Sequence, residues 1–506
     1  MVGSPSPSPA AATSDRPYSW TDVSGNVYRY YKHPMTKAVM FVLLQELCER
    51  LAFYGLTPNL QIFLKEYLGV NDAAANSYIS TFNAILYVTP LLSAVISDTL
   101  LGLYLTILVF SFVYMAGLAL LTLSTIHSIS QPWMIHVSLL FLIAFGAGGI
   151  KSCVNVMGAQ QFHPEEHKDL ITRYYTYFYA SINLGSIVGG IVTPILVESV
   201  SFTASFAFPL VVFVIATIVF IVGNVMGRYV KPKPQGSAVL EILKVIFFSL
   251  TRCSLEKNKE SNGGRFKDGF IEDAKALFRL VPLFSLIIPF VMAYNNMTTA
   301  FLTQGKKMDT NLFGWQMPAQ MMQNVDPIAK YNKMPPVLVR FCIGSLCGAA
   351  SLLVALGVEY MVMSQPLFSV SIWWQIPQFW LIAAGEIFLI STSYEVAFTH
   401  SPGALKAVAS AFNLCFFSIS NVLSAALFQI CEDWLPNFDM ENPSEEAVTG
   451  AHYDYYYMVL VALCIVGAIA SVSMIPYFNK VAAKNAARKA EAEREAAKEE
   501  DVAVNV

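Results

Sequence analysis

Charged residues are scarce in this sequence. Only 13% of the 506 residues are Asp, Glu, Lys or Arg, whereas 55% are apolar. Soluble globular chains carry about 25% charged residues, so the composition excludes an ordinary soluble protein. It predicts an all-α polytopic membrane protein, because helices satisfy their own backbone hydrogen bonds in lipid.

Patterns for disulfide, metal or enzyme chemistry are also lacking. The eight cysteines form no Cys-x-x-Cys pair, so neither a disulfide framework nor a zinc site is indicated. No apolar segment combines a nucleophile with a base or gathers metal ligands. We therefore expect a protein that is not an enzyme, has no metal site and has no nucleic-acid partner.

A targeting signal is missing from the first residues. Residues 1–16 are rich in Ser, Pro and Ala, and they lack the apolar core of a signal peptide. We expect residues 1–35 to form a disordered N-terminus, because such a composition buries too little apolar surface to fold.

Long apolar segments make up most of the chain. Each is long enough for a helix of about 20 residues, the length that crosses a bilayer. Glycines are frequent in them, as at 146–149 and 185–190, and such glycines let membrane helices approach closely. The segments lie at 38–60, 74–97, 100–124, 132–160, 172–197, 204–227, 277–303, 337–360, 371–394, 404–430 and 455–478.

Their spacing and the loop charges predict two halves and an orientation. A six-helix bundle at 36–230 and a second bundle at 277–478 are joined by a linker at 231–276, and 479–506 form a tail. The linker and both terminal segments are basic near the membrane and should be cytoplasmic, whereas the acidic loop 431–454 has no Lys or Arg. The parity then requires one more crossing, which we place at 311–334 as a short or tilted eighth helix, for about 12 in all.

Three charged side chains interrupt the first apolar segment. Glu46, Glu49 and Arg50 share one face of a helix, and Tyr54 borders that face. Each charge costs at least about 2.5 kcal/mol in a membrane, so the cluster should face the bundle interior. One bound proton would neutralise it, which suits proton coupling. The alternative is a fixed salt-bridge triad that holds two helices together.

Two further charges lie near the centres of their segments. Lys151 is about 15 Å or more from either end of its helix, which is too far for its side chain to reach the interface. Glu386 is likewise central between Trp373 and His400. Both residues are candidates for a site inside the membrane, with a purely structural role as the alternative.

Several sequence motifs follow one another at regular intervals. The pattern Glu-x-x-Glu-Arg-Phe-x-Tyr-Tyr-Gly is met at 46–55 except at Leu51 and Phe53, and others occur at 82–91, 148–154, 178–186, 304–309 and 374–386. In these motifs the chain resembles the proton-dependent oligopeptide transporter family, which includes plant nitrate and peptide transporters, within the major facilitator superfamily. The resemblance implies two six-helix halves.

The resemblance also implies roles for individual residues. Glu46, Glu49 and Arg50 would couple protonation to conformational change, and Arg50 or Lys151 could reach a substrate carboxylate. Lys151 could instead pair with the first-helix carboxylates. The remaining implied binding residues are Tyr54, Tyr87 and Asn183, which would line the peptide site, and Glu386, which would meet the peptide amine.

Two positions depart from the family pattern. Asp326 stands where the family has Asn before a proline, and an acid there would add a negative group near the amine site or simply be solvated. Thr303 stands where peptide-transporting members often carry Glu, so proton release could differ. We include Asp326 among the candidate binding residues.

The implied activity is proton-coupled symport of di- and tripeptides by alternating access, driven by a proton gradient rather than a cofactor. The alternatives are transport of nitrate or another small anion, and a non-transporting receptor derived from the same fold. The expected partners are a small-molecule substrate, protons and the lipid bilayer. We expect a multi-pass protein of the plasma membrane rather than of a vacuole or lysosome.

Overall fold

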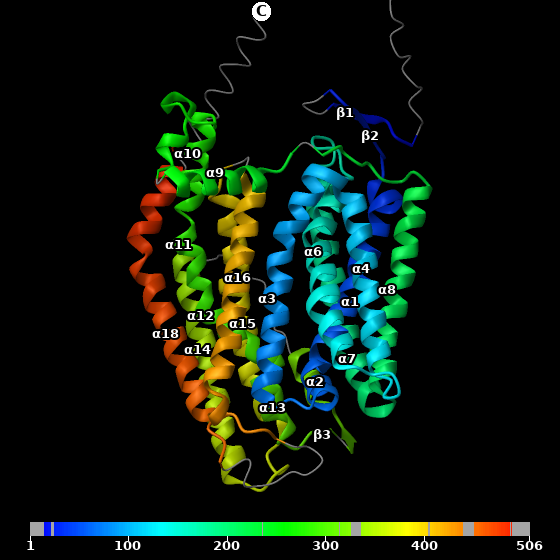
Figure 1. Cartoon of the computed structure of the whole chain (residues 1–506), viewed down its shortest axis with the longest axis vertical. Coiled ribbons are helices and arrows are strands. Elements are labelled where there is room, and N and C mark those ends of the chain that lie inside the picture. Colours follow the sequence, from blue (N-terminus) through cyan, green and yellow to red (C-terminus); the bar gives the residue numbers. More distant parts are fainter. Residues whose placement is uncertain are drawn as a thin grey trace, which may run out of the picture.

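The structure is a computed structural model that describes residues 15–21, 25–234, 236–252, 254–312, 314–324, 335–402, 405–438, 450–485 and 487. Its long helices run side by side along one axis (Figure 1). Within these residues, nine helical stretches are long and apolar enough to cross a membrane. The upper end below means the end with α9 and β1 in Figure 1, and the lower end is the opposite one, with β3.

The N-terminal half coincides with the first six apolar segments. Its first helix bends at Pro58, where the α-helical pattern tightens into a short 3₁₀ turn. The elements are η1 (Met35–Val39), α1 (Met40–Leu56), η2 (Thr57–Asn59), α2 (Leu60–Leu68), α3 (Asp72–Ile96), η3 (Ser97–Leu101), α4 (Gly102–Ser124), α5 (Pro132–His136), η4 (Val137–Ile143), α6 (Ala144–Ala159), α7 (Lys168–Ser199) and α8 (Phe202–Val225).

The C-terminal half begins with a broken helix. Prolines at 282 and 289 interrupt it, because proline cannot donate the backbone hydrogen bond that a continuous helix needs. The elements are α11 (Val281–Phe284), η7 (Ser285–Ile287), α12 (Ile288–Tyr294), η8 (Asn295–Thr298), α13 (Ala300–Lys306), α14 (Val337–Ser364), η10 (Ile372–Gln375), α15 (Ile376–Thr399), α16 (Lys406–Ile430), η12 (Glu432–Trp434) and α18 (Tyr453–Ser473).

The eighth helix expected at 311–334 is not found in the described part of that segment. The chain forms a short hairpin of β3 (Asn311–Leu312) and β4 (Trp315–Gln316), then η9 (Ala319–Asn324). Gly314 turns the hairpin at φ 91°, a conformation that favours glycine. Residues 325–334 lie outside the described residues. The polar glutamines of this segment give too little apolar surface for a membrane helix.

The chain nevertheless crosses the membrane between Asn324 and Pro335. Asn324 donates to the Gly190 carbonyl in the lower part of α7. Helix α14 starts beside the end of α15, where Arg340 pairs with Glu395. The segment that follows α14 returns to the lower end, where the Asp309 amide donates to the Val370 carbonyl over 2.7 Å. The parity required by the loop charges is therefore kept.

Part of the N-terminus that we expected to be disordered is ordered. Residues Tyr18–Thr21 (β1) and Val27–Tyr30 (β2) pair antiparallel at the upper end. Aromatic residues alternate along both strands, and such residues favour a pleated, half-buried surface. The rings of Tyr18 and Trp20 pack against His163. The hairpin is thereby held on the loop before α7.

The linker between the halves contains two amphipathic helices. These are α9 (Ala238–Arg252) and α10 (Asp268–Phe278), with the short turns η5 (Glu256–Asn258) and η6 (Glu260–Asn262) between them. Val239, Ile242 and Val245 of α9 are buried against the bundle. Helix α9 lies across the upper end, whereas the membrane helices run along the molecule (Figure 1).

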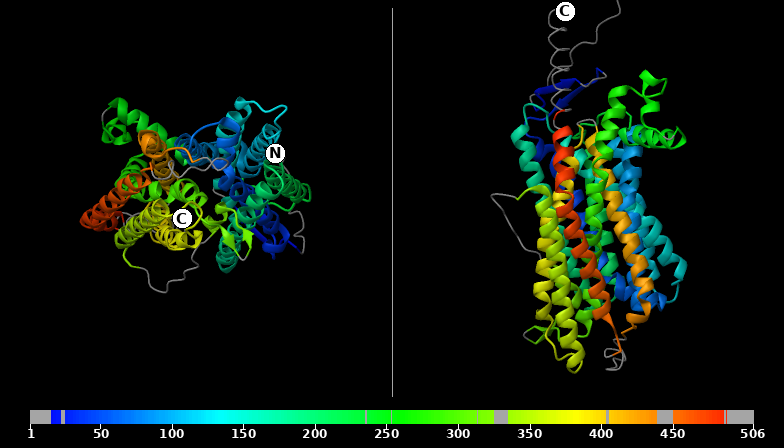
Figure 2. Two further views of the ribbon diagram at one scale, coloured as in Figure 1. Left: turned by 90° about the horizontal axis from the view of Figure 1, so that it is seen from below. Right: turned by 90° about the vertical axis from the view of Figure 1, so that its left-hand side faces the viewer.

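Each half has its own apolar core. One cluster of buried side chains consists of residues of the N-terminal half, and the other belongs to the C-terminal half and the linker, with Ala73 as its one N-terminal member. From below, the two halves lie side by side (Figure 2). Two separate cores allow the halves to move against each other without repacking either one.

Glycines bring two helix pairs into backbone contact, as the sequence predicted. A Cβ atom on Gly185 of α7 would lie 2.5 Å from the Leu47 carbonyl oxygen of α1. A Cβ on Gly148 of α6 would lie 2.5 Å from the Leu86 carbonyl oxygen of α3. These contacts place Lys151, one turn beyond Gly148, next to Tyr87 on α3.

Candidate functional site

The charged cluster of α1 is buried in the N-terminal half. Glu46, Glu49 and Arg50 are 0%, 1% and 5% exposed. The Arg50 Nε atom donates to Glu46 Oε1 over 2.7 Å and lies 3.2 Å from Glu49 Oε2. One guanidinium thus serves two carboxylates, and a single proton would neutralise the group. The ion pairs lie within α1, which argues against a triad that ties two helices together.

Lys151 does not pair with these carboxylates. Among the described residues it has no carboxylate oxygen within 4.0 Å, so one of the two implied pairings is not observed. Its Nζ atom lies over the rings of Tyr87, at 4.5 Å from the centroid, and Phe53, at 5.8 Å. Cation–π contacts of this kind stabilise the ammonium while leaving its hydrogens available for an anionic ligand.

Glu386 joins this group from the C-terminal half. It lies on α15 and interacts electrostatically with Lys151 and Tyr87. Tyr54 interacts in the same way with Arg50 and Tyr87. The structure therefore brings both signs of charge together at the middle of the bundle, on α1, α6 and α15.

An aromatic wall that the sequence analysis missed connects the halves at this level. Tyr87 of α3 packs against Phe417 of α16 with ring centroids 5.3 Å apart, and Phe417 stacks on Tyr394 of α15 at 6.0 Å. Tyr394 interacts electrostatically with Glu386. Its place two turns after Glu386, on the same face of one helix, was the signal that could have identified it.

The two remaining candidate residues are less informative. The Asn183 amide donates to the Tyr179 carbonyl of its own helix, α7, over 3.1 Å. Asn183 lies two residues before the α1 contact at Gly185, so it faces the neighbourhood of α1 without a recorded contact to the charged residues. Asp326 lies outside the described residues.

The halves are joined by hydrogen bonds that gather in the lower part. Gln61 of α2 donates to Thr303 over 2.7 Å and accepts from Lys306 over 2.8 Å. Thr303, which departs from the family pattern, thus takes part in a contact between halves. Further bonds join Lys65 to the Phe438 carbonyl, Asp72 to the Phe438 amide, Asn71 to Glu432 and Ser77 to Gln429.

The geometry favours binding and conformational coupling over bond-making chemistry. No group of three or more His, Cys, Asp or Glu side chains that could hold a metal ion occurs among the described residues. What the site offers is a buried carboxylate pair that can take a proton, two cations, and an acid on the opposite half. A ligand with charges of both signs could contact both halves at once.

Comparison with known proteins places this geometry in a family. The model of the POT family matches residues 104–438. Protein NRT1/ PTR FAMILY 8.5 of Arabidopsis thaliana is 26% identical over 557 residues, which cover 93% of this chain and 93% of the relative. Solute carrier family 15 member 2 of Mus musculus is 31% identical over 333 residues, covering 62% of this chain and 45% of the relative.

Solved structures share the fold. The in meso crystal structure of the POT family transporter PepTSo superposes with a TM-score of 0.73 at 21% identity, covering 88% of this chain and 98% of that one. An auto-inhibited POT family peptide transporter gives a TM-score of 0.72 at 23% identity, covering 87% and 96%. Since the family model matches well over half of the sequence, this chain belongs to the POT family of membrane transporters, with the fold of the major facilitator superfamily.

Proposed function

We propose that the chain is a proton-coupled symporter of di- and tripeptides. The observation that carries the proposal is the placement of opposite charges on opposite halves. Arg50 and Lys151 come from the N-terminal half, and Glu386 comes from the C-terminal half. A zwitterionic peptide would place its carboxylate on the cations and its amine on Glu386. Its contacts with both halves would favour the state in which they close around it.

Protonation supplies the second part of the mechanism. When Glu49 is ionised, Glu46 and Glu49 compete for Arg50, which keeps the guanidinium on α1. A proton on Glu49 removes that competition and makes the cluster neutral. The cluster would then cross between states together with the peptide, because burying a neutral group costs less than burying a net charge.

The orientation follows from charge and from the contacts between halves. We propose that the upper end, with the basic linker and both termini, is cytoplasmic. The hydrogen bonds between Gln61, Thr303 and Lys306 then close the outer side, and the described conformation is open toward the cytoplasm. Structural neighbours that are described as peptide transporters support the peptide as cargo.

A second candidate is a non-transporting receptor derived from the fold. It is favoured by one observation: β3, β4 and η9 occupy the described part of 311–334 in place of a membrane helix. Helix α7, which borders this region, exposes Tyr175 and Tyr179 by 48% and 65%. Nitrate transport, the third candidate, would require Glu386 to tolerate an anion in a site of low dielectric constant.

Uptake of radiolabelled dialanine into proteoliposomes of the full chain tests these candidates. With an inward proton gradient we expect dialanine to accumulate, and nitrate not to compete with it. Glu386→Gln should weaken dialanine binding about thirtyfold or more, because removing one partner of a buried charged contact costs about 2–5 kcal/mol. Accumulation of nitrate without dialanine exchange would establish anion transport, and exchange of neither would establish the receptor.

A further inference from the structure

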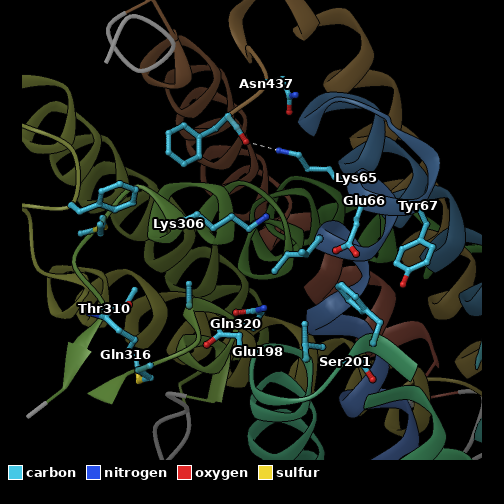
Figure 3. A pocket seen from close by; sticks show the side chains of 18 of the residues that line it. Lys65, Glu66, Tyr67, Glu198, Ser201, Lys306, Thr310, Gln316, Gln320 and Asn437 are labelled. Atoms are coloured by element: carbon cyan, nitrogen blue, oxygen red, sulfur yellow. Dashed lines mark hydrogen bonds between the residues drawn. The ribbon is translucent and has the colours of Figure 1, made fainter. Parts of the chain in front are cut away.

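A second cavity lies at the lower end, away from the central charged cluster. Its volume is about 1040 Å³, and it lies between the end of α2, the end of α7, the end of α13 and the segment from β4 to η9. We call it the lower vestibule. Figure 3 shows Lys65 and Lys306 extending into it from opposite sides, with Glu66, Glu198 and Gln320 around them.

Lys306 is the unusual residue of this cavity. It is 6% exposed, and its Nζ atom donates to Gln61 Oε1 over 2.8 Å. Among the described residues no carboxylate oxygen lies within 4.0 Å of it. The other two buried lysines here differ: Lys307 pairs with Glu359 at 3.0 Å, and Lys65 pairs with Asp72 at 2.8 Å. A buried ammonium without a counter-ion is costly unless an anion completes its environment.

The neighbours of Lys306 are fixed so that its remaining hydrogens point to the vestibule. The Gln61 Nε2 atom donates to Asn76 over 2.8 Å and to Thr303 over 2.7 Å, which turns the Gln61 oxygen toward Lys306. That oxygen uses one of the three ammonium hydrogens. Gln320, which also lines the cavity, is 4% exposed, and its Nε2 atom has no hydrogen-bond partner within the described part of the chain.

Two buried donor groups in one cavity fit a carboxylate. A carboxylate has two oxygens and accepts from both an ammonium and an amide without leaving either group unsatisfied. The same cavity also contains Glu66, Glu198 and Asp309 in its lining. With Lys65 already paired, these acids would repel a simple anion such as nitrate and attract an amine. The lining therefore suits a solute with charges of both signs.

We propose that the lower vestibule is a second binding site for small zwitterions, in which Lys306 and Gln320 receive the carboxylate and the acidic lining receives the amine. The proposal rests on the proposed function only in its cargo, a short peptide. A bound carboxylate would compete with Gln61 for the ammonium of Lys306. Loading of the vestibule would thus weaken a contact between α2 and α13 that closes this end.

Binding of radiolabelled dialanine to the full chain in lipid nanodiscs tests the proposal. The Glu386→Gln variant impairs the central site, so that the vestibule can be measured alone. In this background we expect one saturable dialanine site to remain. Adding Lys306→Met or Gln320→Ala should weaken that site about tenfold or more, whereas Lys306→Arg should preserve it. The control is Gln316→Ala, an exposed glutamine at the rim, which should leave binding unchanged.

Competition with other solutes identifies the ligand class. Unlabelled dialanine should displace the label, whereas N-acetyl-dialanine and nitrate should not, because neither carries an amine. Thermal unfolding of each variant shows that the protein is folded, and the Lys306→Arg variant separates loss of charge from loss of the fold.

The possible failures are distinct. If the parent binds dialanine but Glu386→Gln abolishes all binding, or if Lys306→Met leaves the remaining site unchanged, the vestibule proposal is wrong and the proposed function stands. If the remaining site takes nitrate or N-acetyl-dialanine as well as dialanine, the ligand is an anion and the zwitterion assignment is wrong. If no variant and not the parent binds dialanine, both proposals are wrong.

Discussion

At the scale of single residues, the chain keeps its charges inside the membrane by giving each a different environment. Arg50 neutralises part of the carboxylate pair on its own helix, Lys151 lies over aromatic rings, and Lys306 depends on a glutamine oxygen. These environments differ in what a ligand could add. Only the Glu46–Glu49 pair has more carboxylates than cations within ion-pair distance, so it is the group that a proton would change most.

Glu49→Gln should separate proton coupling from substrate binding. The amide keeps the shape of the side chain but can neither gain nor lose a proton. We expect proton-driven accumulation of dialanine in proteoliposomes to disappear, while exchange of labelled for unlabelled dialanine continues within about threefold of the parent. The matched control is Glu241→Gln on the exposed face of α9, which should alter neither activity. Undiminished uphill uptake in Glu49→Gln would remove this glutamate from the coupling mechanism.

The sequence identified the central charges because their cost inside a long apolar segment is large and leaves few structural explanations. Lys306 escaped notice for the opposite reason. It follows the segment 277–303 directly, and a lysine at a helix end is normally read as reaching the interface. Tyr394 was missed because tyrosine is common in membrane helices, and only the packing of α15 on α16 shows that it continues the site through Phe417.

At the scale of helices and strands, the segments were predictable within a few residues, since an apolar run long enough to cross a bilayer has few alternatives. The breaks within helices were harder to place, because they depend on tertiary contacts. Asn59, for example, donates to the Gly55 carbonyl and to Thr193 of α7 where the first helix changes direction. The hairpin of β1 and β2 was missed, because composition alone does not reveal its docking partner.

Gly185→Ala tests the close packing of α7 on α1. The added methyl group would lie 2.5 Å from the Leu47 carbonyl oxygen, a backbone atom that cannot move alone. We expect destabilisation by about 1–3 kcal/mol, seen as a lower apparent melting temperature of the purified protein. Gly357→Ala in α14 is the control, because its methyl group meets no atom within 4 Å and alanine favours a helix. Equal melting temperatures for the two variants would contradict the packing argument.

The docking of the N-terminal hairpin should weaken in acid. His167, in the loop before α7, accepts a hydrogen bond from the His163 amide through Nδ1, and its ring contacts Tyr18. Burial lowers the pKa of His167 below its usual value, with a smaller contribution from His163. The folded state therefore favours the neutral ring. The stabilisation is present above the pKa of the unfolded state, about 6.5, and is lost as the pH falls through the folded-state value.

Hydrogen–deuterium exchange of residues 18–30 measures this effect. Between about pH 7.5 and about pH 5.5, we expect exchange corrected for intrinsic rates to become faster in the parent. The His167→Gln variant, whose amide oxygen can still accept from the His163 amide, should show a smaller pH dependence. An unchanged pH dependence in this variant would assign the effect to another group.

At the scale of the whole molecule, the sequence predicted the number of crossings better than their form. The basic linker and tail required an even number of crossings, and α14 indeed starts at the upper end. What composition could not tell is how the chain returns there after η9. A polar segment can cross only if its backbone groups are satisfied by protein or water, which depends on neighbours that are remote in the sequence.

The contacts between the halves predict that the lower end must open during transport. Asn71 of the N-terminal half donates to Glu432 of the C-terminal half over 2.5 Å. Cysteines at these two positions, joined by a short reducible cross-linker, should hold the lower end closed. We expect dialanine uptake to stop on cross-linking and to recover on reduction, because alternating access requires both ends to open in turn.

Two controls make this result specific to movement between the halves. Tyr67 and His127 stack at 5.1 Å near the same end but belong to the N-terminal half alone, so a cross-link between cysteines placed there should leave uptake intact. Each single cysteine variant, treated with the reagent, should also transport. If the Asn71–Glu432 cross-link leaves uptake unchanged, the substrate does not pass through the lower end. The hydrogen bonds of Gln61 with Thr303 and Lys306 would then be a permanent part of the fold rather than a gate, because a contact that never opens cannot control access.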